Sequence, residues 1–158
     1  MSKQITIFET DPNSKDAIFL MEELSSTLES ITGSSGKSSF STTDINENHG
    51  VFAIAYSEKE EPVGCGAIRR INDKTAEVKR MYAKDQGVGI GTKMLDYLET
   101  KAREMGYELL VLETRLINSN AVFFYENRGY NRIPNYGKYI GRVEAVCFQK
   151  VLKSEGAL

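Results

Sequence analysis

Alternating and helix-periodic hydrophobic positions predict most of the elements of this chain. Over residues 4–10 the isoleucines alternate with polar neighbours, which predicts an opening strand. Over residues 18–31 apolar residues recur every three or four positions, which predicts a helix whose apolar stripe packs in the core. The stripe consists of Ile18, Met21, Leu24, Leu28 and Ile31.

The middle of the chain reads as three strands, a glycine-rich turn and a helix. The runs "VFAIAYS", "EPVGCGAIRRI" and "TAEVKRMYA" are separated by turn-rich residues, so we expect an antiparallel meander. After the glycines, apolar residues fall on one face of a second helix, which we expect to end near Gly106. That face comprises Ile90, Met94, Leu95, Leu98, Ala102 and Met105.

In the last third of the chain the sequence pattern predicts a buried strand, a capped helix and two further strands. These are "ELLVLET", "NSNAVFFYENRG", "YNRI" and "EAVCFQK". The order β-α-β-β-β-α-β-α-β-β indicates an α+β or mixed α/β fold around one central sheet, and 158 residues suit a single domain over 1–158. The Gly- and Ser-rich segment 32–44 is either a surface loop near a substrate entrance or only a linker.

Composition narrows the function classes. A net charge of -2 means that the chain has no excess of basic residues for binding nucleic acid. An anionic ligand must therefore be bound by a local site. No apolar run reaches the roughly 20 residues needed to cross a bilayer, and the first residues lack a signal-peptide core, so we expect a cytoplasmic protein without a membrane partner. With one histidine and no clustered ligands we expect no metal site.

Cys65 and Cys147 lie in apolar stretches and are expected to be buried free thiols.

The stretch "DQGVGIGTKML" raises the question of a phosphate site. Glycine lets the backbone approach a ligand, and the start of a helix offers free N–H groups, although a tight turn alone also explains such a loop. The Walker pattern fails because Lys93 follows Thr92 instead of Gly91. The Rossmann pattern fails because Thr92 stands where its third glycine belongs, which leaves a Rossmann-type nucleotide binder a distant alternative.

Another pattern fits. The run from Gln86 to Gly91 resembles the Gln/Arg-x-x-Gly-x-Gly/Ala signature of GNAT-superfamily N-acetyltransferases. "AEVKRMY" is similar to the family's central strand, "NSNAVFFYENRGY" resembles its Asn-x-x-Ala-x-x-x-Tyr helix, and "RIPNYGKYIGRVEAVCFQK" resembles the tail of a bacterial subgroup with Ile-Pro and Tyr-Gly-x-Tyr. The resemblance implies a mixed central β-sheet, mostly antiparallel with a splayed parallel pair, flanked by helices.

The resemblance also implies acetyl-CoA as co-substrate and a set of residues that hold it. The pyrophosphate is expected at Gln86, Gly87, Val88, Gly89, Gly91 and Thr92. A bulge in the central strand leaves the backbone of Met81, Tyr82 and Ala83 for the pantetheine arm and the thioester carbonyl. Asn118 either binds the pantetheine arm or only caps its helix.

By the same resemblance a primary amine attacks the thioester directly, without an acyl-enzyme. Glu77 is the first candidate for the base that deprotonates the amine, and Glu113 is the second. Glu77 alternatively pairs with Arg69 or Lys79 as a structural charge. Tyr125 is expected as the acid that serves the leaving thiolate, with a packed core aromatic as the alternative.

The acceptor is expected to be a small-molecule or peptide amine. Arg69, Arg70, Tyr136 and Tyr139 flank the expected acceptor cleft and suggest a carboxylate or a ring on the acceptor. The chain departs from the family between Ala83 and Asp85, where the approach to the loop is about two residues shorter than usual and lacks a proline. A glutamine in place of arginine at the first loop position predicts modest CoA affinity. A homodimer and, as a second function, a non-catalytic acyl-CoA-binding module are compatible with the same sequence.

Overall fold

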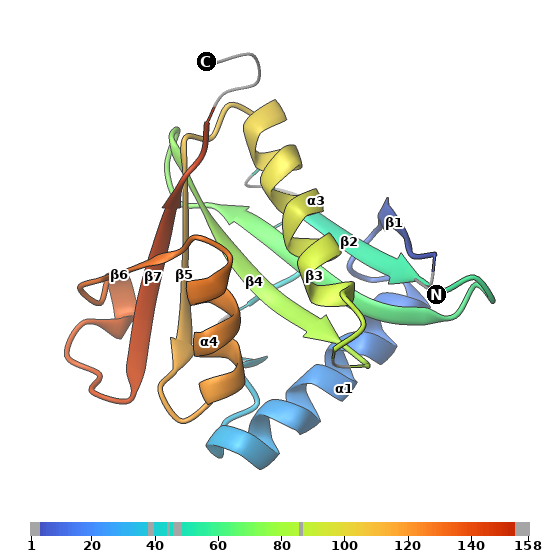
Figure 1. Cartoon of the computed structure of the whole chain (residues 1–158), viewed down its shortest axis with the longest axis horizontal. Coiled ribbons are helices and arrows are strands. Elements are labelled where there is room, and N and C mark those ends of the chain that lie inside the picture. Colours follow the sequence, from blue (N-terminus) through green and yellow to red (C-terminus); the bar gives the residue numbers. More distant parts are fainter. Residues whose placement is uncertain (1–3, 38–39, 44, 46–48, 86, 154–158) are drawn as a thin grey trace.

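The chain folds around one seven-stranded sheet with the strand order β1-β2-β3-β4-β5-β7-β6 (Figure 1). The computed structural model describes residues 4–37, 40–43, 45, 49–85 and 87–153. Its elements are β1 Thr6–Glu9, α1 Lys15–Thr32, β2 Val51–Tyr56, β3 Pro62–Arg70, β4 Thr75–Ala83, α3 Ile90–Glu104, β5 Leu109–Arg115, α4 Ser119–Asn127, β6 Asn131–Ile133, the 3-10 helix η2 Gly137–Tyr139, and β7 Ala145–Val151. The predicted order of strands and helices is confirmed, and η2 is an element that the hydrophobic pattern did not predict.

The sheet is mixed, as expected. β2, β3 and β4 form the predicted antiparallel meander, and β4 and β5 form the one parallel pair among the described strands. The connection between these two strands runs through α3, which packs on the sheet as a parallel crossover requires (Figure 1). In the described part of the chain no helix combines the length and the apolar character that a bilayer span requires.

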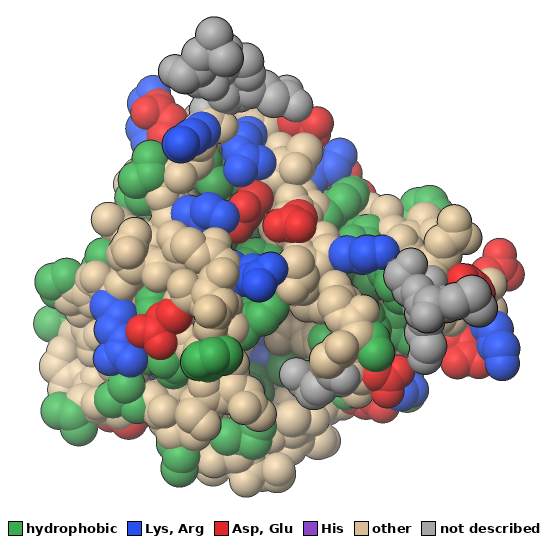
Figure 2. Space-filling model, viewed as in Figure 1, with side chains coloured by type: hydrophobic (Ala, Val, Ile, Leu, Met, Phe, Trp, Pro, Cys, Tyr) green, Lys and Arg blue, Asp and Glu red, His purple; other side chains and the backbone are tan. Residues whose placement is uncertain are grey.

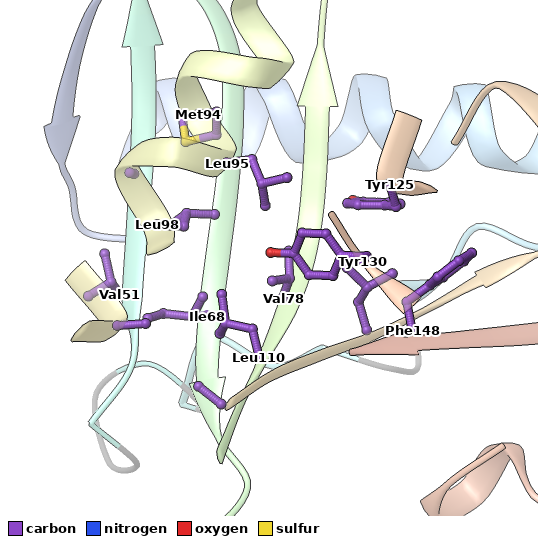
Figure 3. Packing of buried hydrophobic residues seen from close by; sticks show 14 of the residues in the cluster. Val51, Ile68, Val78, Met94, Leu95, Leu98, Leu110, Tyr125, Tyr130 and Phe148 are labelled. Atoms are coloured by element: carbon purple, nitrogen blue, oxygen red, sulfur yellow. The ribbon is translucent and has the colours of Figure 1, made fainter. Parts of the chain in front are cut away.

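Helices cover both faces of the sheet, with α3 and α4 on one face and α1 on the other (Figure 1). In β2 the side chains alternate between the two layers: Val51 and Ala53 pack in the α3 layer, whereas Phe52 and Ile54 pack in the α1 layer. Figure 3 shows the α3 layer, where side chains of the helix meet those of five strands and α4. Cys65 and Cys147 are buried free thiols, as predicted.

The predicted core stripe of α1 is wrong in part. Ile18 and Ile31 are 46% and 38% exposed. Leu24 is buried as predicted, but the helix packs on β2 and β3 through Ala17 and Leu20, which the predicted stripe did not include. Hydrophobic spacing located the helix but placed its buried face too far to one side.

Glycine in β3 lets α3 lie close to the sheet. A Cβ added at Gly66 would stand 2.8 Å from the sulfur of Met81 and 2.9 Å from side-chain carbons of Met94 and Leu98. A side chain fits there only if the side chains of Met81, Met94 and Leu98 shift. Gly66 therefore lets α3 pack closely over β3 and against Met81 of β4, the strand that carries the candidate site.

This close approach predicts opposite effects for two Gly→Ala substitutions. Gly66→Ala should lower the free energy of unfolding by about 1–3 kcal/mol because it overpacks the α3 layer. Gly91→Ala is the matched control, since its Cβ would meet the Phe124 ring at an ordinary 3.5 Å. Helix propensity should then stabilise the protein by about 0.5–1 kcal/mol. Urea unfolding of both variants tests the pair, and equal effects would contradict it.

Candidate active site

β4 and β5 pair over three residues and then diverge. Their parallel ladder joins Thr75–Glu77 to Leu109–Val111 and stops there. β4 continues to Ala83 and β5 to Arg115, and Figure 1 shows their far ends well apart, with α4 beside β5. From Val78 to Tyr82 the backbone of β4 therefore faces a strand with which it is not paired in the described structure. This is the splayed pair that the sequence resemblance implied.

A β-bulge at Arg80 marks the point of divergence. Arg80 has φ +53°, which is unusual for a residue other than glycine. The register with β3 passes from Ala67 opposite Lys79 to Cys65 opposite Tyr82, so β4 holds one extra residue in this stretch. The expected bulge is thus present, one residue before Met81.

The side chain of Arg80 fixes the bulge to α1. Its guanidinium donates to the backbone oxygen of Met21 at 3.0 Å, to that of Ser35 at 3.3 Å and to the hydroxyl of Ser25. Burial lowers the pKa of this guanidinium below its ordinary value, but the group stays charged at any ordinary pH. One arginine thus joins the bulge, the helix and the start of the segment 32–44.

A cavity of about 170 Å³ occupies the divergence. β4 and β5 form two of its walls, and α1, α4 and residues 138–142 supply the others. Thr32, Ser34 and Gly36 line it as well, so the beginning of the Gly/Ser-rich segment lies at the cleft, as expected. Figure 2 shows that the surface is also hollowed between α4 and the turn before α3.

Glu113 lines this cleft, and one of its oxygens accepts no hydrogen bond from the described residues. Its Oε2 is buried and has no hydrogen-bond partner in the described part of the structure, and the nearest cation is the Nε of Arg115 at 3.6 Å. Burial raises the pKa of Glu113 from its usual 4.5, although Arg115 and Lys79 act in the opposite direction. A buried carboxylate oxygen that lacks a partner is costly unless a ligand supplies one.

Glu77, the first candidate base, lies elsewhere. Its side chain is 0% exposed and does not line the cleft. Arg69 Nε donates to one of its oxygens at 2.7 Å, and the hydroxyl of Tyr136 donates to the other. The alternative reading, a structural charge paired with Arg69, describes this geometry better than a base does. The charge is buried, however, and not on the surface of the strand.

Lys79 and Tyr139 form the wall of the cleft between the two glutamates. The ammonium of Lys79 donates to the hydroxyl of Tyr139 at 3.0 Å and lies 3.9 Å from Glu77 Oε1. Burial lowers the pKa of Lys79, and the charge of Glu77 limits that decrease. Of the four expected acceptor-side residues, only Tyr139 lines the cleft. Arg70 pairs with Asp73 in the turn between β3 and β4.

Tyr125, Asn118 and Met81 come together around the cleft, as the resemblance implied. Tyr125 is 7% exposed and packs edge-to-face against Tyr130, with ring centroids 5.6 Å apart. Burial raises the pKa of Tyr125, so its hydroxyl stays protonated. Asn118 caps α4, because its Oδ1 accepts from the backbone N–H of Ala121 at 3.4 Å. The cap is thus observed, and a second role for Asn118 stays a prediction.

The glycine turn lies beside the cleft and not in its wall. Gln86 is outside the described residues. Gly87 and Gly89 have φ +82° and +84°, and nothing lies within 4 Å of where their Cβ atoms would be, so their backbone is open to a ligand. Gly91 and Thr92 form the first turn of α3, and the turn approaches Phe124, the neighbour of Tyr125.

The remaining expected contacts lie at the end of β4. Tyr82 faces α1, and its hydroxyl is 3.4 Å from a carboxylate oxygen of Glu23. Ala83 pairs with Gly64 of β3. The backbone N–H of Lys84 donates to the oxygen of Val63 at 2.8 Å, which holds the short approach to the glycine turn against β3.

The opened sheet and the glycine turn at a helix start define an acyltransferase of the GNAT type. The family model described as "Acetyltransferase (GNAT) family" matches residues 17–130, and the chain belongs to this family. Members of the family use acetyl-CoA. The particular bacterial subgroup suggested by the tail stays a prediction.

Curated relatives match part of the chain. It is 34% identical over 80 residues to the IAA acetyltransferase of Azospirillum brasilense, a match that covers 49% of this chain and 52% of the relative. It is 30% identical over 103 residues to N-alpha-acetyltransferase 50 of Danio rerio, covering 58% and 61% of the two chains. The chain thus spans about half the length of the curated relatives it matches.

Solved structures resemble it over nearly the whole length. A protein from Klebsiella pneumoniae described as an acyl-CoA N-acyltransferase has a TM-score of 0.81 and 27% identity, and the match covers 95% of this chain and 99% of that one. The paiA N-acetyltransferase of Thermoplasma acidophilum in complex with coenzyme A has a TM-score of 0.72, 18% identity and coverage of 94% and 99%. At that identity the second likeness bears on the fold alone.

The two glutamates should respond oppositely to neutralisation. The folded pKa of Glu113 is raised, so its ionised form destabilises the folded state above that pKa, and the penalty disappears below the usual 4.5. Glu113→Gln should therefore raise the free energy of unfolding at pH 7.5, by an amount that shrinks towards pH 4. Glu77→Gln should lower it by about 3 kcal/mol, because a buried ion pair is broken.

Denaturant unfolding of both variants from pH 4 to 8 measures this difference. A less stable Glu113→Gln protein at pH 7.5 would show that the attraction to Arg115 and Lys79 outweighs the cost of burying the Glu113 carboxylate.

Proposed function

We propose that this chain is an N-acetyltransferase that transfers the acetyl group of acetyl-CoA to a primary amine by direct attack within a ternary complex. The observation that carries the proposal is Glu113, whose buried Oε2 accepts no hydrogen bond from the described residues, in a cleft between two diverging strands, with Tyr125 in the same cleft. An acyl-CoA-binding module without turnover requires neither group, and we keep it as the outcome that the experiments below exclude or establish.

Backbone groups of the glycine turn and of β4 suggest where each part of acetyl-CoA binds. The pyrophosphate binds at Gly87–Thr92, where unsatisfied N–H groups and the positive end of α3 favour an anion. The pantetheine arm runs along β4 at Met81–Ala83, in the place that β5 vacates, with Asn118 beside it. A backbone N–H near the bulge binds the thioester oxygen as negative charge develops on it, a contact worth about 3–4 kcal/mol in enzymes of this type.

Glu113 is the proposed general base. An aliphatic amine has a pKa near 10.4 and is mostly protonated at neutral pH, so a proton must leave before attack. The raised pKa of Glu113 narrows the gap to the amine, and its free oxygen can accept the proton directly or through one water. Glu77 is a positioning residue in this scheme, because it holds Arg69 and Tyr136 behind the cleft.

The bonds and charges balance with these two groups. The ammonium of the acceptor first gives one proton to Glu113. The neutral amine nitrogen then forms the C–N bond to the acetyl carbon, the C–S bond breaks, and the nitrogen loses its second proton to solvent. The sulfur leaves as a thiolate near Tyr125. Because burial raises the pKa of Tyr125, its hydroxyl stabilises the thiolate chiefly by donating a hydrogen bond, and solvent supplies the final proton.

Glu113→Gln should remove the base while leaving the fold intact. We expect the rate of amide formation to fall about 10²–10⁴-fold and the acidic limb of the pH–rate profile to disappear, because that limb reports Glu113. CoA-thiol release over an amine panel from pH 5 to 9 measures both. Glu77→Gln is the matched control and should keep the acidic limb at temperatures where it remains folded. If the acidic limb of the pH–rate profile disappears in Glu77→Gln but not in Glu113→Gln, Glu77 is the general base.

Tyr125→Phe should separate chemistry from binding. We expect kcat to fall about tenfold, the worth of one hydrogen bond to a developing charge, with KM for acetyl-CoA nearly unchanged. Steady-state kinetics and calorimetric titration with CoA measure the two quantities. Unaltered kcat would leave Tyr125 a core aromatic, and CoA binding without turnover on any amine would establish the non-catalytic module.

A further inference from the structure

The cleft is much more positive than the chain as a whole. Its lining includes five cationic side chains and one carboxylate, that of Glu113, whereas the whole chain carries a net charge of -2. The cations are Lys79, Arg80, Arg115, Lys138 and Arg142. Positive charge is therefore concentrated where the acceptor enters, and the low-dielectric walls of a cleft strengthen its field.

Three of these cations already have polar partners. The guanidinium of Arg80 binds α1 and residue 35, and Lys79 binds the hydroxyl of Tyr139. Arg115 Nη1 donates to Glu144 Oε1 at 3.1 Å, and its Nε faces Glu113. These groups shape the floor and one side of the cleft.

The other two cations of the cleft, Lys138 and Arg142, have no carboxylate partner in the part of the chain that the structure describes. Among the described residues neither has an Asp or Glu oxygen within 4.0 Å. The amide of Asn135 donates to the backbone oxygens of Tyr139 at 3.1 Å and of Arg142 at 2.9 Å, which holds this segment in place. Two exposed cations without a carboxylate partner are thus presented at the cleft by a backbone that hydrogen bonds fix.

We propose that the acceptor amine also carries a carboxylate, and that Lys138 and Arg142 bind this carboxylate while the amine lies at Glu113. The inference rests on the proposed function and names its substrate class: a small amino acid-like zwitterion. The guanidinium of Arg142 matches a carboxylate in two parallel hydrogen bonds. The Nζ of Lys138 lies 5.6 Å from the centroid of the Tyr139 ring, on the side of the cleft that Tyr139 shares with Lys79.

The same charges explain why a carboxylate is needed. A simple alkylammonium brings only positive charge and meets repulsion from every cation of the cleft. An acceptor with its own anion offsets that repulsion, and the surrounding cations then lower the pKa of its amine, which eases proton transfer to Glu113. Diamines and polyamines should be poor acceptors for this reason.

The first test compares each of several amino acids with its own carboxamide, alongside an aliphatic diamine and amines that carry a sulfonate or a phosphonate. The amine of the carboxamide is the less basic one, with a pKa near 7.7–8.0, and is more often deprotonated at neutral pH. Intrinsic reactivity thus favours the carboxamide. We nevertheless expect kcat/KM for the acid to be at least about tenfold higher, because the charged pair is lost in the carboxamide.

The second test removes the two cations. In Lys138→Gln/Arg142→Gln the preference for acid over carboxamide should fall by about tenfold or more, with KM for acetyl-CoA unchanged. The unchanged KM distinguishes an acceptor site from a site for the phosphates of CoA. Arg132→Gln is the matched control: this arginine on β6 is 53% exposed, pairs with Glu126 and lies outside the cleft lining.

The outcomes are separable. Equal rates for acids and carboxamides, a preference for diamines, or an unaltered preference in the double variant overturns the inference and leaves the acetyltransferase standing. A preference for the sulfonate or phosphonate over the carboxylate overturns the choice of anion. Absence of turnover with every amine, while CoA still binds, overturns the proposed function and the inference together.

Discussion

The early end of the ladder between β4 and β5 is the constraint on which the rest of the structure depends. Buried backbone N–H and C=O groups require partners, and an unpartnered strand edge inside a protein is costly. Here the ladder to β5 ends at Glu77, and the bulge at Arg80 follows in β4. We propose that the extended pantetheine arm of acetyl-CoA binds the stretch of β4 backbone that has no strand partner on this side.

Several otherwise separate features maintain that divergence. The guanidinium of Arg80 ties the bulge to α1, and the bare position at Gly66 brings α3 close to β4. On the other side, Glu99 of α3 accepts from the hydroxyl of Tyr130 at 2.9 Å and from the ammonium of Lys150 at 3.0 Å. This network joins α3 to Tyr130 and to β7, the strand beyond β5 in the sheet.

Two glutamates on the diverging strands have different environments, and the environments separate their roles. Glu77 is fully buried, and both of its oxygens are bonded. Glu113 is also largely buried, but its Oε2 accepts no hydrogen bond from the described residues and has only the Nε of Arg115 at 3.6 Å. A carboxylate whose oxygens already accept hydrogen bonds is a poorer proton acceptor than one with an oxygen that accepts none. On this ground we propose Glu113 as the base and Glu77 as a positioning residue.

Hydrophobic periodicity was enough to predict the order of the elements and the meander, because these depend on local alternation. The parallel pair, the bulge and the gathering of Met81, Asn118 and Tyr125 required the family resemblance. The choice between Glu77 and Glu113 could not be made from sequence, because the partners of Glu77 come from a neighbouring strand and from Tyr136, which is 59 residues away. The resemblance placed Tyr139 at the acceptor cleft, but it did not single out Lys138 and Arg142, because only the folded segment shows that these two side chains also line the cleft.

Amide hydrogen exchange with and without acetyl-CoA tests most directly whether the divergence of β4 from β5 exists to bind the cofactor. Binding should slow exchange at the amides of Met81 and Tyr82 and in the first turn of α3, with little change in the antiparallel ladder of β1 and β2. Slowed exchange confined to regions away from β4 and α3, or no slowing at all under saturating acetyl-CoA, would contradict this explanation of the fold.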